Sequence, residues 1–193
     1  MATYRSIAYD QVLGNPSAMV LLQTSSVTDG DGDLTFTGLS SDYKEYMITH
    51  LNYKSQNDGE GLAIQGTTDG TNYNITMTTT HFSAYHLEDD SATSLAYNAA
   101  GDQAQGTAFN PLTRNVGSGD DEGTCGYIHL FNPSDTTFVK HYMARSQANA
   151  ANDNAYDNFS AGYFNTTSAI TAIQFQPTDG DMEAGTFKLY GVN

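Results

Sequence analysis

Residues 168–192 read Ser168-Ala-Ile-Thr-Ala-Ile-Gln-Phe175, then a polar turn, then Ala184-Gly-Thr-Phe-Lys-Leu-Tyr-Gly-Val192. Both segments alternate between apolar and polar residues, and the turn between them contains Asp179-Gly180-Asp181. Alternating segments on either side of an Asp-Gly turn are typical of an antiparallel β-hairpin. Because side chains alternate across a strand, Phe187 and Leu189 are expected to face the core and Tyr190 to face away from it. We therefore expect this hairpin to complete a β-sheet.

The rest of the chain favours the same class of fold. Thr, Tyr, Gly, Asn, Asp and Ser are abundant, and there is no Trp among the 193 residues. Thr and Tyr favour strands, whereas Gly, Asn and Asp favour the turns between them. Alternating segments recur at intervals of about 10 to 13 residues, as in sandwiches and barrels rather than βαβ folds. The sequence predicts an all-β fold, an antiparallel β-sandwich of jelly-roll-like topology with about nine or ten strands.

Three parts of the chain differ in pattern. Residues 1–17, which contain Tyr4, Ile7 and Tyr9 among polar residues, are expected to form an N-terminal arm. Residues 18–193 are long enough for a single β-sandwich domain. Within that domain, residues from about 80 to 123 have weak periodicity, which indicates a long excursion that projects from the sandwich and packs against partners. The arm has two interpretations, since its aromatic residues can be buried on their own domain or on a neighbouring subunit.

Alternation also assigns side chains to faces in two longer segments. In residues 43–54 one face is expected to hold Tyr46, Ile48, His50 and Asn52, and the other Met47, Thr49, Leu51 and Tyr53. In residues 124–132 Cys125, Tyr127, His129 and Phe131 are expected to lie opposite Ile128 and Leu130. The single cysteine excludes an internal disulfide, and its place in a strand predicts a small buried side chain. Residues 81–98 fit either two short strands or a strand and one helical turn.

Charge and hydropathy exclude several classes of partner. The formal net charge of -15 argues against nucleic acids and against anionic membrane surfaces, which attract basic proteins. The longest apolar run, Ala18-Met-Val-Leu-Leu22, is too short to cross a bilayer. The N-terminus lacks the basic start and the apolar run of about 7 to 15 residues that mark a secretory signal peptide. We expect synthesis in a cytoplasm, with no nucleic-acid or membrane partner.

The chain contains no recognisable catalytic or metal-binding pattern. Its five histidines and one cysteine have none of the spacings of zinc sites. The string Val116-Gly-Ser-Gly-Asp120 differs from the nucleophile elbow of hydrolases, and Asp29-Gly-Asp-Gly-Asp33 departs from the EF-hand calcium loop. The carboxylates cluster in turns and not as pairs in a rigid cleft. We expect no enzymatic activity, no catalytic residue, no metal and no cofactor.

Several segments resemble a known group of proteins. The matching strings are Leu34-Thr-Phe-Thr-Gly-Leu39, Thr68-Asp-Gly70, Gly126-Tyr-Ile-His-Leu-Phe-Asn-Pro133 and Gly185-Thr-Phe-Lys-Leu-Tyr-Gly191. They resemble β-sandwich virion structural proteins of tailed bacteriophages, which end in a Gly-Thr-x-x-Leu-Tyr-Gly strand. The resemblance covers the chain apart from the arm and the segment from about 80 to 123, and its motifs belong to the scaffold.

The resemblance implies a role in the virion. It implies a capsid decoration (cement) protein that stabilises the shell as a homo-oligomer, often a trimer, in contact with the major capsid protein or other virion proteins. The alternative is a tail or head-fibre module that binds host surface glycans. Either protein would be made in the host cytoplasm and located in the virion, which agrees with the absence of a signal peptide pattern.

Aromatic residues outside the matching strings are the candidate contact residues. The expected partner or oligomer contacts are Tyr4, Ile7 and Tyr9 of the arm and Phe82, Tyr85 and Phe109 of the excursion. Glycan binding would use tyrosines that face a ligand, and the candidates besides Tyr85 are Tyr97, Tyr156 and Tyr163. Tyrosine suits both roles, but the absence of Trp, which has the largest stacking surface, counts against sugar binding.

Overall fold

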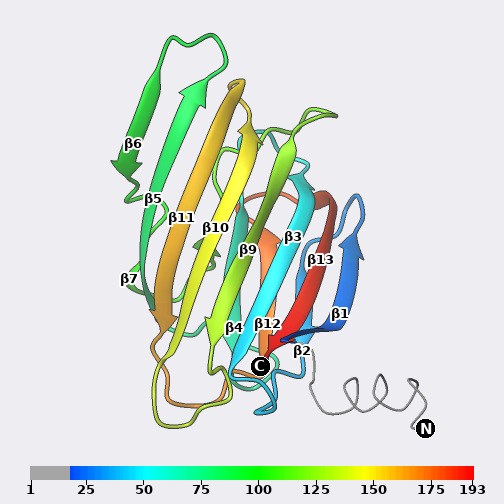
Figure 1. The fold of residues 1–193 in the computed structure, drawn as a ribbon, viewed down its shortest axis with the longest axis vertical. Helices are drawn as coiled ribbons and strands as arrows, with labels where there is room; N and C mark the ends of the chain where they lie inside the picture. Colours follow the sequence, from blue (N-terminus) through cyan, green and yellow to red (C-terminus); the bar gives the residue numbers. More distant parts are fainter. Residues whose placement is uncertain (1–17) are drawn as a thin grey trace, which may run out of the picture.

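The computed structural model describes residues 18–193, which form thirteen β-strands and no helix (Figure 1). The strands are β1 (Met19–Val27), β2 (Leu34–Thr37), β3 (Glu45–Ser55), β4 (Leu62–Thr67), β5 (Met77–Leu87), β6 (Thr93–Tyr97), β7 (Ala104–Gly106), β8 (Asn110–Pro111), β9 (Gly123–Phe131), β10 (Lys140–Ala150), β11 (Asn154–Phe164), β12 (Ala172–Pro177) and β13 (Met182–Val192). The predicted arm, residues 1–17, lies outside the described residues. No helix in the described part of the chain is long and apolar enough to cross a membrane.

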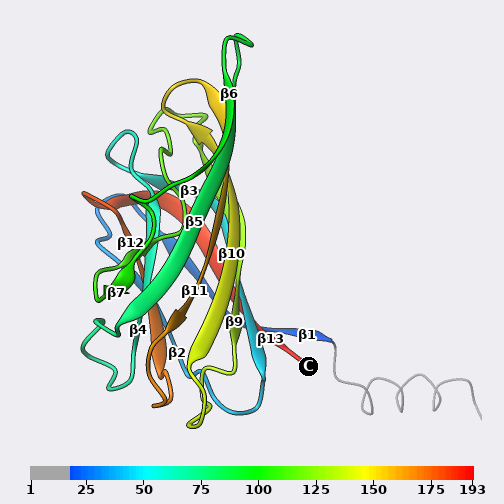
Figure 2. The same ribbon diagram turned by 90° about the vertical axis from the view of Figure 1, so that its left-hand side faces the viewer.

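The strands form two antiparallel sheets that pack face to face (Figure 2). The larger sheet has nine strands in the order β1-β13-β3-β9-β10-β11-β5-β6, with β7 also paired to β5. The smaller sheet has four strands in the order β2-β12-β4-β8. The smaller sheet covers only part of the larger one, and the β5–β6 hairpin extends beyond it (Figures 1 and 2).

The predicted all-β class and the two-sheet antiparallel arrangement are confirmed. The strand count exceeds the expected nine or ten, because short strands such as β6, β7 and β8 lie in the segment with weak periodicity. The jelly-roll topology is not confirmed, since the strands divide into sheets of nine and four. Within the predicted excursion of about 80–123, the structure places most of β5, all of β6, β7 and β8, and the start of β9.

The predicted C-terminal hairpin is wrong in its pairing. β12 belongs to the four-stranded sheet, where it pairs with β2 and β4, whereas β13 belongs to the nine-stranded sheet, where it pairs with β1 and β3. The Asp179–Asp181 turn therefore connects the two sheets. The physical reason is burial: an arch places apolar residues of both strands in one core, whereas a flat hairpin would place them in one sheet.

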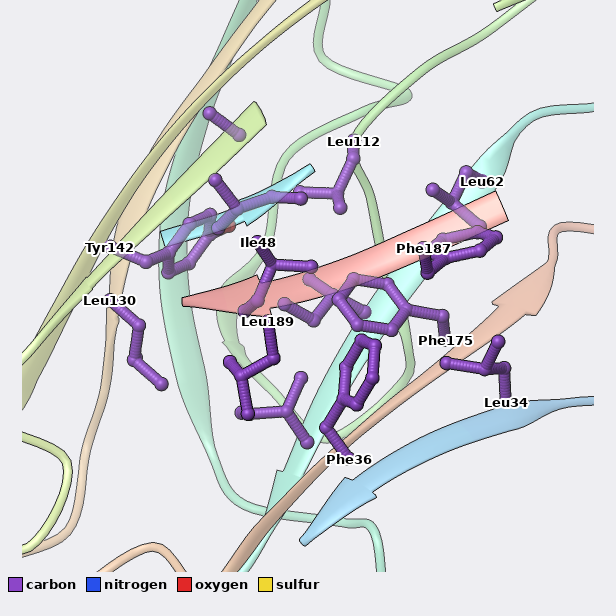
Figure 3. Packing of buried hydrophobic residues seen from close by; sticks show 14 of the residues in the cluster. Leu34, Phe36, Ile48, Leu62, Leu112, Leu130, Tyr142, Phe175, Phe187 and Leu189 are labelled. Atoms are coloured by element: carbon purple, nitrogen blue, oxygen red, sulfur yellow. The ribbon is translucent and has the colours of Figure 1, made fainter. Parts of the chain in front are cut away.

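The core lies between the sheets and includes residues from both arms of this arch (Figure 3). The rings of Phe175 and Phe187 have centroids 5.5 Å apart, and Phe36 meets Phe175 edge to face at 6.4 Å. Phe187 and Leu189 are fully buried and Tyr190 is half-buried, as the alternation predicted. Burying a side chain of this size contributes about 1.5 to 3 kcal/mol.

A bulge in β3 changes the predicted faces of its last residues. Tyr46, Ile48 and His50 are buried as expected, but Asn52 is exposed and Tyr53 is buried. Asn52 has a φ of 51°, and the pairing of β3 with β9 shifts between His50 and Tyr53. An extra residue in a strand reverses the alternation beyond it, so Tyr53 turns into the core.

Candidate interaction surface

The two faces of the nine-stranded sheet have different surroundings. One face packs on the small sheet and holds buried side chains such as Ile48, Ile128 and Leu130. No strand of the described chain covers the opposite face, which we call the outer face. Large apolar residues are exposed there, including Leu51, Phe82, Leu95, Tyr97, Tyr127 and Met143. Contiguous exposed apolar residues on a soluble protein mark an interaction surface more often than scattered ones do.

Five of the outer-face residues form one row across five strands. In register, Tyr97 of β6 pairs with Phe82 of β5, which pairs with Phe159 of β11, then Arg145 of β10 and Tyr127 of β9. Directly paired residues of antiparallel strands point to the same face. We call these five residues the aromatic row.

The aromatic row is held by ring and charge contacts. Phe82 and Phe159 stack with centroids 4.7 Å apart and planes 4° from parallel. The Arg145 guanidinium lies 4.9 Å from the Phe159 centroid and donates to both carboxylate oxygens of Asp157, with Nε–Oδ1 at 3.1 Å and Nη2–Oδ2 at 2.7 Å. These hydrogen bonds raise the pKa of Arg145, so the guanidinium stays charged. Its charge is balanced within the surface, because Asp157 lies on the same face.

A second row next to the first extends the apolar surface. Met143 of β10 pairs with His129 of β9, which pairs with Met47 of β3. The ring of Tyr127 meets His129 edge to face at 5.4 Å, and His129 stacks on Phe131 with centroids 6.2 Å apart. His129 Nδ1 hydrogen-bonds to Glu45, so the carboxylate on this part of the face also has a partner.

A depression of ≈ 690 Å³ lies beside the aromatic row on the outer face. It is lined by residues of β3, β9, β10 and β11, including Leu51, Cys125, Tyr127, Gln147 and Asp157. The prediction that Cys125 is buried is wrong: its side chain is exposed on the outer face, where Sγ accepts a hydrogen bond from the Asn52 N–H at 3.3 Å. Alternation correctly grouped Cys125 with Tyr127 and His129 on one face of the strand. It does not determine which of the two strand faces is buried.

The predicted contact residues separate into several places. Tyr4, Ile7 and Tyr9 lie outside the described residues. Phe82 and Tyr97 meet in the aromatic row. Phe109 is half-buried, immediately before β8 of the small sheet.

Tyr85 and Tyr156 stack on each other at 6.0 Å on the inner side of the β5–β11 pair, where the Ser83 hydroxyl donates to the Tyr156 hydroxyl. Their rings point away from the outer face, although Tyr156 is among the residues that line the depression there. Tyr163 lies on the outer face, with its ring centroid 6.0 Å from that of His141, but it is four residues along β11 from Phe159. Only part of the predicted set therefore forms one surface.

Sequence reasoning missed Tyr127, Met143, Arg145 and Phe159 as contact residues. Alternation placed Tyr127 on one strand face with His129, which was the available signal. The strand register that aligns them with Phe82 depends on pairing between residues far apart in the chain.

Among residues 18–193, no group of three or more His, Cys, Asp or Glu side chains is arranged to hold a metal ion. The Asp29–Asp33 segment instead forms a turn in which Asp31 accepts hydrogen bonds from the Thr28 N–H at 2.7 Å and the Thr28 hydroxyl at 3.1 Å. Comparison of the chain with protein-family models and with curated proteins found no match.

Proposed function

We propose that this chain is a non-enzymatic virion structural protein, a capsid decoration protein that binds the shell through the outer face of its nine-stranded sheet. The observation that supports the proposal best is the aromatic row, an exposed and charge-balanced line of side chains across five strands. The resemblance to tailed-phage virion proteins supplies the virion context. The same context implies that the protein acts as a homo-oligomer in contact with the major capsid protein or another virion protein.

The chemistry of the outer face suits a protein partner. Aromatic residues, Met and Arg are enriched at the centres of protein interfaces, whereas unpaired charges are depleted there. Tyr127, Phe82 and Tyr97 are 41%, 42% and 58% exposed, so each has surface to bury against a partner. Arg145 already has its carboxylate partner, which lowers the cost of removing its charge from water.

Apart from Asp157 and Glu45, which are paired with Arg145 and His129, the acidic residues named here lie in turns away from this face. Many are in turns at the end of the sandwich where β3, β5 and β10 finish, including Asp58, Glu88–Asp90, Asp120–Glu122 and Asp179–Glu183. Three hydrogen bonds link the turn of Asp58 to three other turns: Gln56 Nε2 donates to Asp29 at 2.7 Å, Asn57 Nδ2 to Asp179 at 3.0 Å, and the Ser118 N–H to Asp58 at 3.1 Å. Acids in this position keep the particle surface hydrated without repelling a partner at the outer face.

A second candidate function follows from the depression beside Tyr127. An exposed tyrosine ring next to the hydrogen-bonding groups of Gln147, Asp157 and Arg145 can stack on a sugar ring and bond its hydroxyls. This site favours the alternative of a tail or head-fibre module that binds host surface glycans.

Two measurements test the proposal. The first is the copy number of the chain in purified particles of the virus that encodes it, by stained gel or quantitative mass spectrometry. Hundreds of copies per particle support capsid decoration, and a few to tens indicate a tail or fibre component. The second is a glycan array probed with the purified protein, for which decoration predicts no bound sugar. Absence of the chain from particles overturns the virion proposal as a whole.

A further inference from the structure

β6 ends the nine-stranded sheet with an open edge. No described strand lies beyond it, and Figure 1 shows it as the outermost strand beside β5. Its sequence, Thr93-Ser-Leu-Ala-Tyr97, has no charge, no proline and no glycine. Natural sheet edges are usually protected against pairing by lysine, proline or a bulge, and β6 has none of these.

The hydrogen bonds of the hairpin determine which backbone groups of β6 are free. The Leu87 N–H donates to the Ala92 carbonyl at 3.0 Å, and the Asn98 N–H donates to the His81 carbonyl at 2.8 Å. In an antiparallel ladder hydrogen-bonded pairs alternate with non-bonded pairs. The register of β5 and β6 therefore assigns the backbone hydrogen bonds to β5 to Ser94 and Ala96. The backbone N–H and C=O groups that point outward are those of Thr93, Leu95 and Tyr97.

The side chains of the same three residues lie on the outer face. Thr93, Leu95 and Tyr97 pair with His86, Ala84 and Phe82, which are on that face of β5. Leu95 is 73% exposed and Tyr97 is 58% exposed, the former being the most exposed large apolar side chain in the described chain. The free edge therefore combines unpaired backbone groups with an apolar side-chain surface.

We propose that β6 pairs antiparallel with β6 of a second copy of this chain, around a two-fold axis that passes between the two Leu95 residues. Leu95 would face Leu95 of the second copy, and Thr93 would face Tyr97 of the second copy. Each of these pairs joins residues whose N–H and C=O groups point outward, so these outward groups form backbone hydrogen bonds between the two copies. The two sheets become one continuous antiparallel sheet.

The self-complementary pattern of this edge identifies a second copy as the partner. An isologous contact uses the same patch on both subunits. Under two-fold symmetry centred on Leu95, the outward N–H and C=O groups of β6 in one copy meet the outward C=O and N–H groups of β6 in the other. A two-fold axis perpendicular to the sheet also leaves both outer faces on one side. Both aromatic rows then face the same shell surface, so the proposed shell-binding function extends to a pair of subunits. A two-fold pair also differs from the trimer that the resemblance implies.

The charges near the edge predict how the pairing depends on salt. Glu88, Asp89 and Asp90 form the turn before β6, and Asp102 accepts a hydrogen bond from the Tyr97 hydroxyl after it. Antiparallel pairing brings the turn of one copy towards Asp102 of the other. Added salt screens this repulsion and strengthens the pairing.

Disulfide trapping tests the register. In a Cys125→Ser background, Leu95→Cys places two thiols in a directly opposed hydrogen-bonded pair, with Cα atoms about 5.5 Å apart, within disulfide range. Ala96→Cys is the matched control, because Ala96 points to the other face and would lie diagonal to its counterpart. Under mild oxidation we expect dimers of Leu95→Cys in at least tenfold excess over Ala96→Cys. Equal yields, or no dimer from either variant, overturn the pairing.

A proline variant tests the edge without cysteines. The Leu95 N–H points away from β5, so Leu95→Pro removes an outward donor and leaves the β5 ladder intact. We expect sedimentation velocity to show weaker self-association for Leu95→Pro than for Leu95→Val, with circular dichroism unchanged. Unchanged association in Leu95→Pro contradicts the proposal. Both measurements test the pairing without virus particles. If trapped dimers form but bind no shell, the decoration function is refuted and the pairing stands.

Discussion

Phe175 of β12 and Phe187 of β13 pack with ring centroids 5.5 Å apart, although their strands belong to different sheets. The chain reaches this contact through a turn in which the Gln56 N–H donates to the Asp181 carbonyl at 2.9 Å. The last two strands therefore connect the sheets through the core. The stability of the sandwich should depend on this contact more than on any exposed position of β13.

The first prediction concerns this contact. Phe187→Ala removes a fully buried ring and leaves a cavity between the sheets, so we expect the free energy of unfolding to fall by about 3 to 5 kcal/mol. Lys188→Ala, one residue along on the outer face, should change it by less than about 0.5 kcal/mol. Urea denaturation of both variants checks the difference. Equal effects would show that β13 does not direct Phe187 into the core.

The second prediction concerns acid stability. His50 is fully buried, and neither ring nitrogen has a hydrogen-bond partner in the described part of the chain. Burial lowers its pKa from 6.5 to about 3. Between these values the unfolded chain takes up a proton that the folded chain does not, so the stability from neutral His50 is complete above about pH 6.5 and is lost as the pH falls towards 3.

A His50→Leu variant isolates this effect. Leucine has no charge to acquire, so from pH 7 to pH 5 the wild type should lose about 2 kcal/mol more stability than the variant. Urea midpoints at the two pH values give the comparison. The same pH dependence in wild type and His50→Leu would rule out His50 as the source.

The third prediction concerns the bulge in β3. Asn52 has a φ of 51°, in the left-handed region that glycine adopts without strain and that alanine does not. We expect Asn52→Gly to keep wild-type stability to within a few tenths of a kcal/mol, and Asn52→Ala to lose about 1 to 2 kcal/mol. Thermal melts of the two variants measure the gap. A more stable alanine variant would mean that the bulge does not fix this backbone conformation.

Much of the local structure could be predicted from the sequence. Period-two alternation placed Phe187 and Leu189 inward, Tyr190 away from the core, and Tyr127 on the face opposite Ile128, because those preferences arise within one strand. The all-β class followed from the same alternation and from the turn residues. These features depend on residues that are neighbours in the chain.

Features that depend on distant pairing could not be predicted. A hairpin and an arch have the same alternation and the same Asp-Gly turn, and only the partners of β12 and β13 distinguish them. The aromatic row likewise requires the register of β5, β11, β10 and β9, in which Phe82 pairs with Phe159, 77 positions further along the chain. The bulge at Asn52 reversed the face of Tyr53 without any glycine to mark it.

The central claim is that the outer face binds a protein shell, and a shell-binding titration of matched variants tests it most directly. Wild type, a Phe82→Ala/Tyr127→Ala double variant and an Asp120→Asn/Asp121→Asn double variant are co-sedimented with shells that lack the chain, after melting curves establish that each is folded. Loss of two interface aromatics should weaken binding by tenfold or more, since central aromatic residues typically contribute about 2 kcal/mol or more. The acidic-turn variant should bind as the wild type does. Binding by the Phe82→Ala/Tyr127→Ala protein that equals the wild type would contradict the claim.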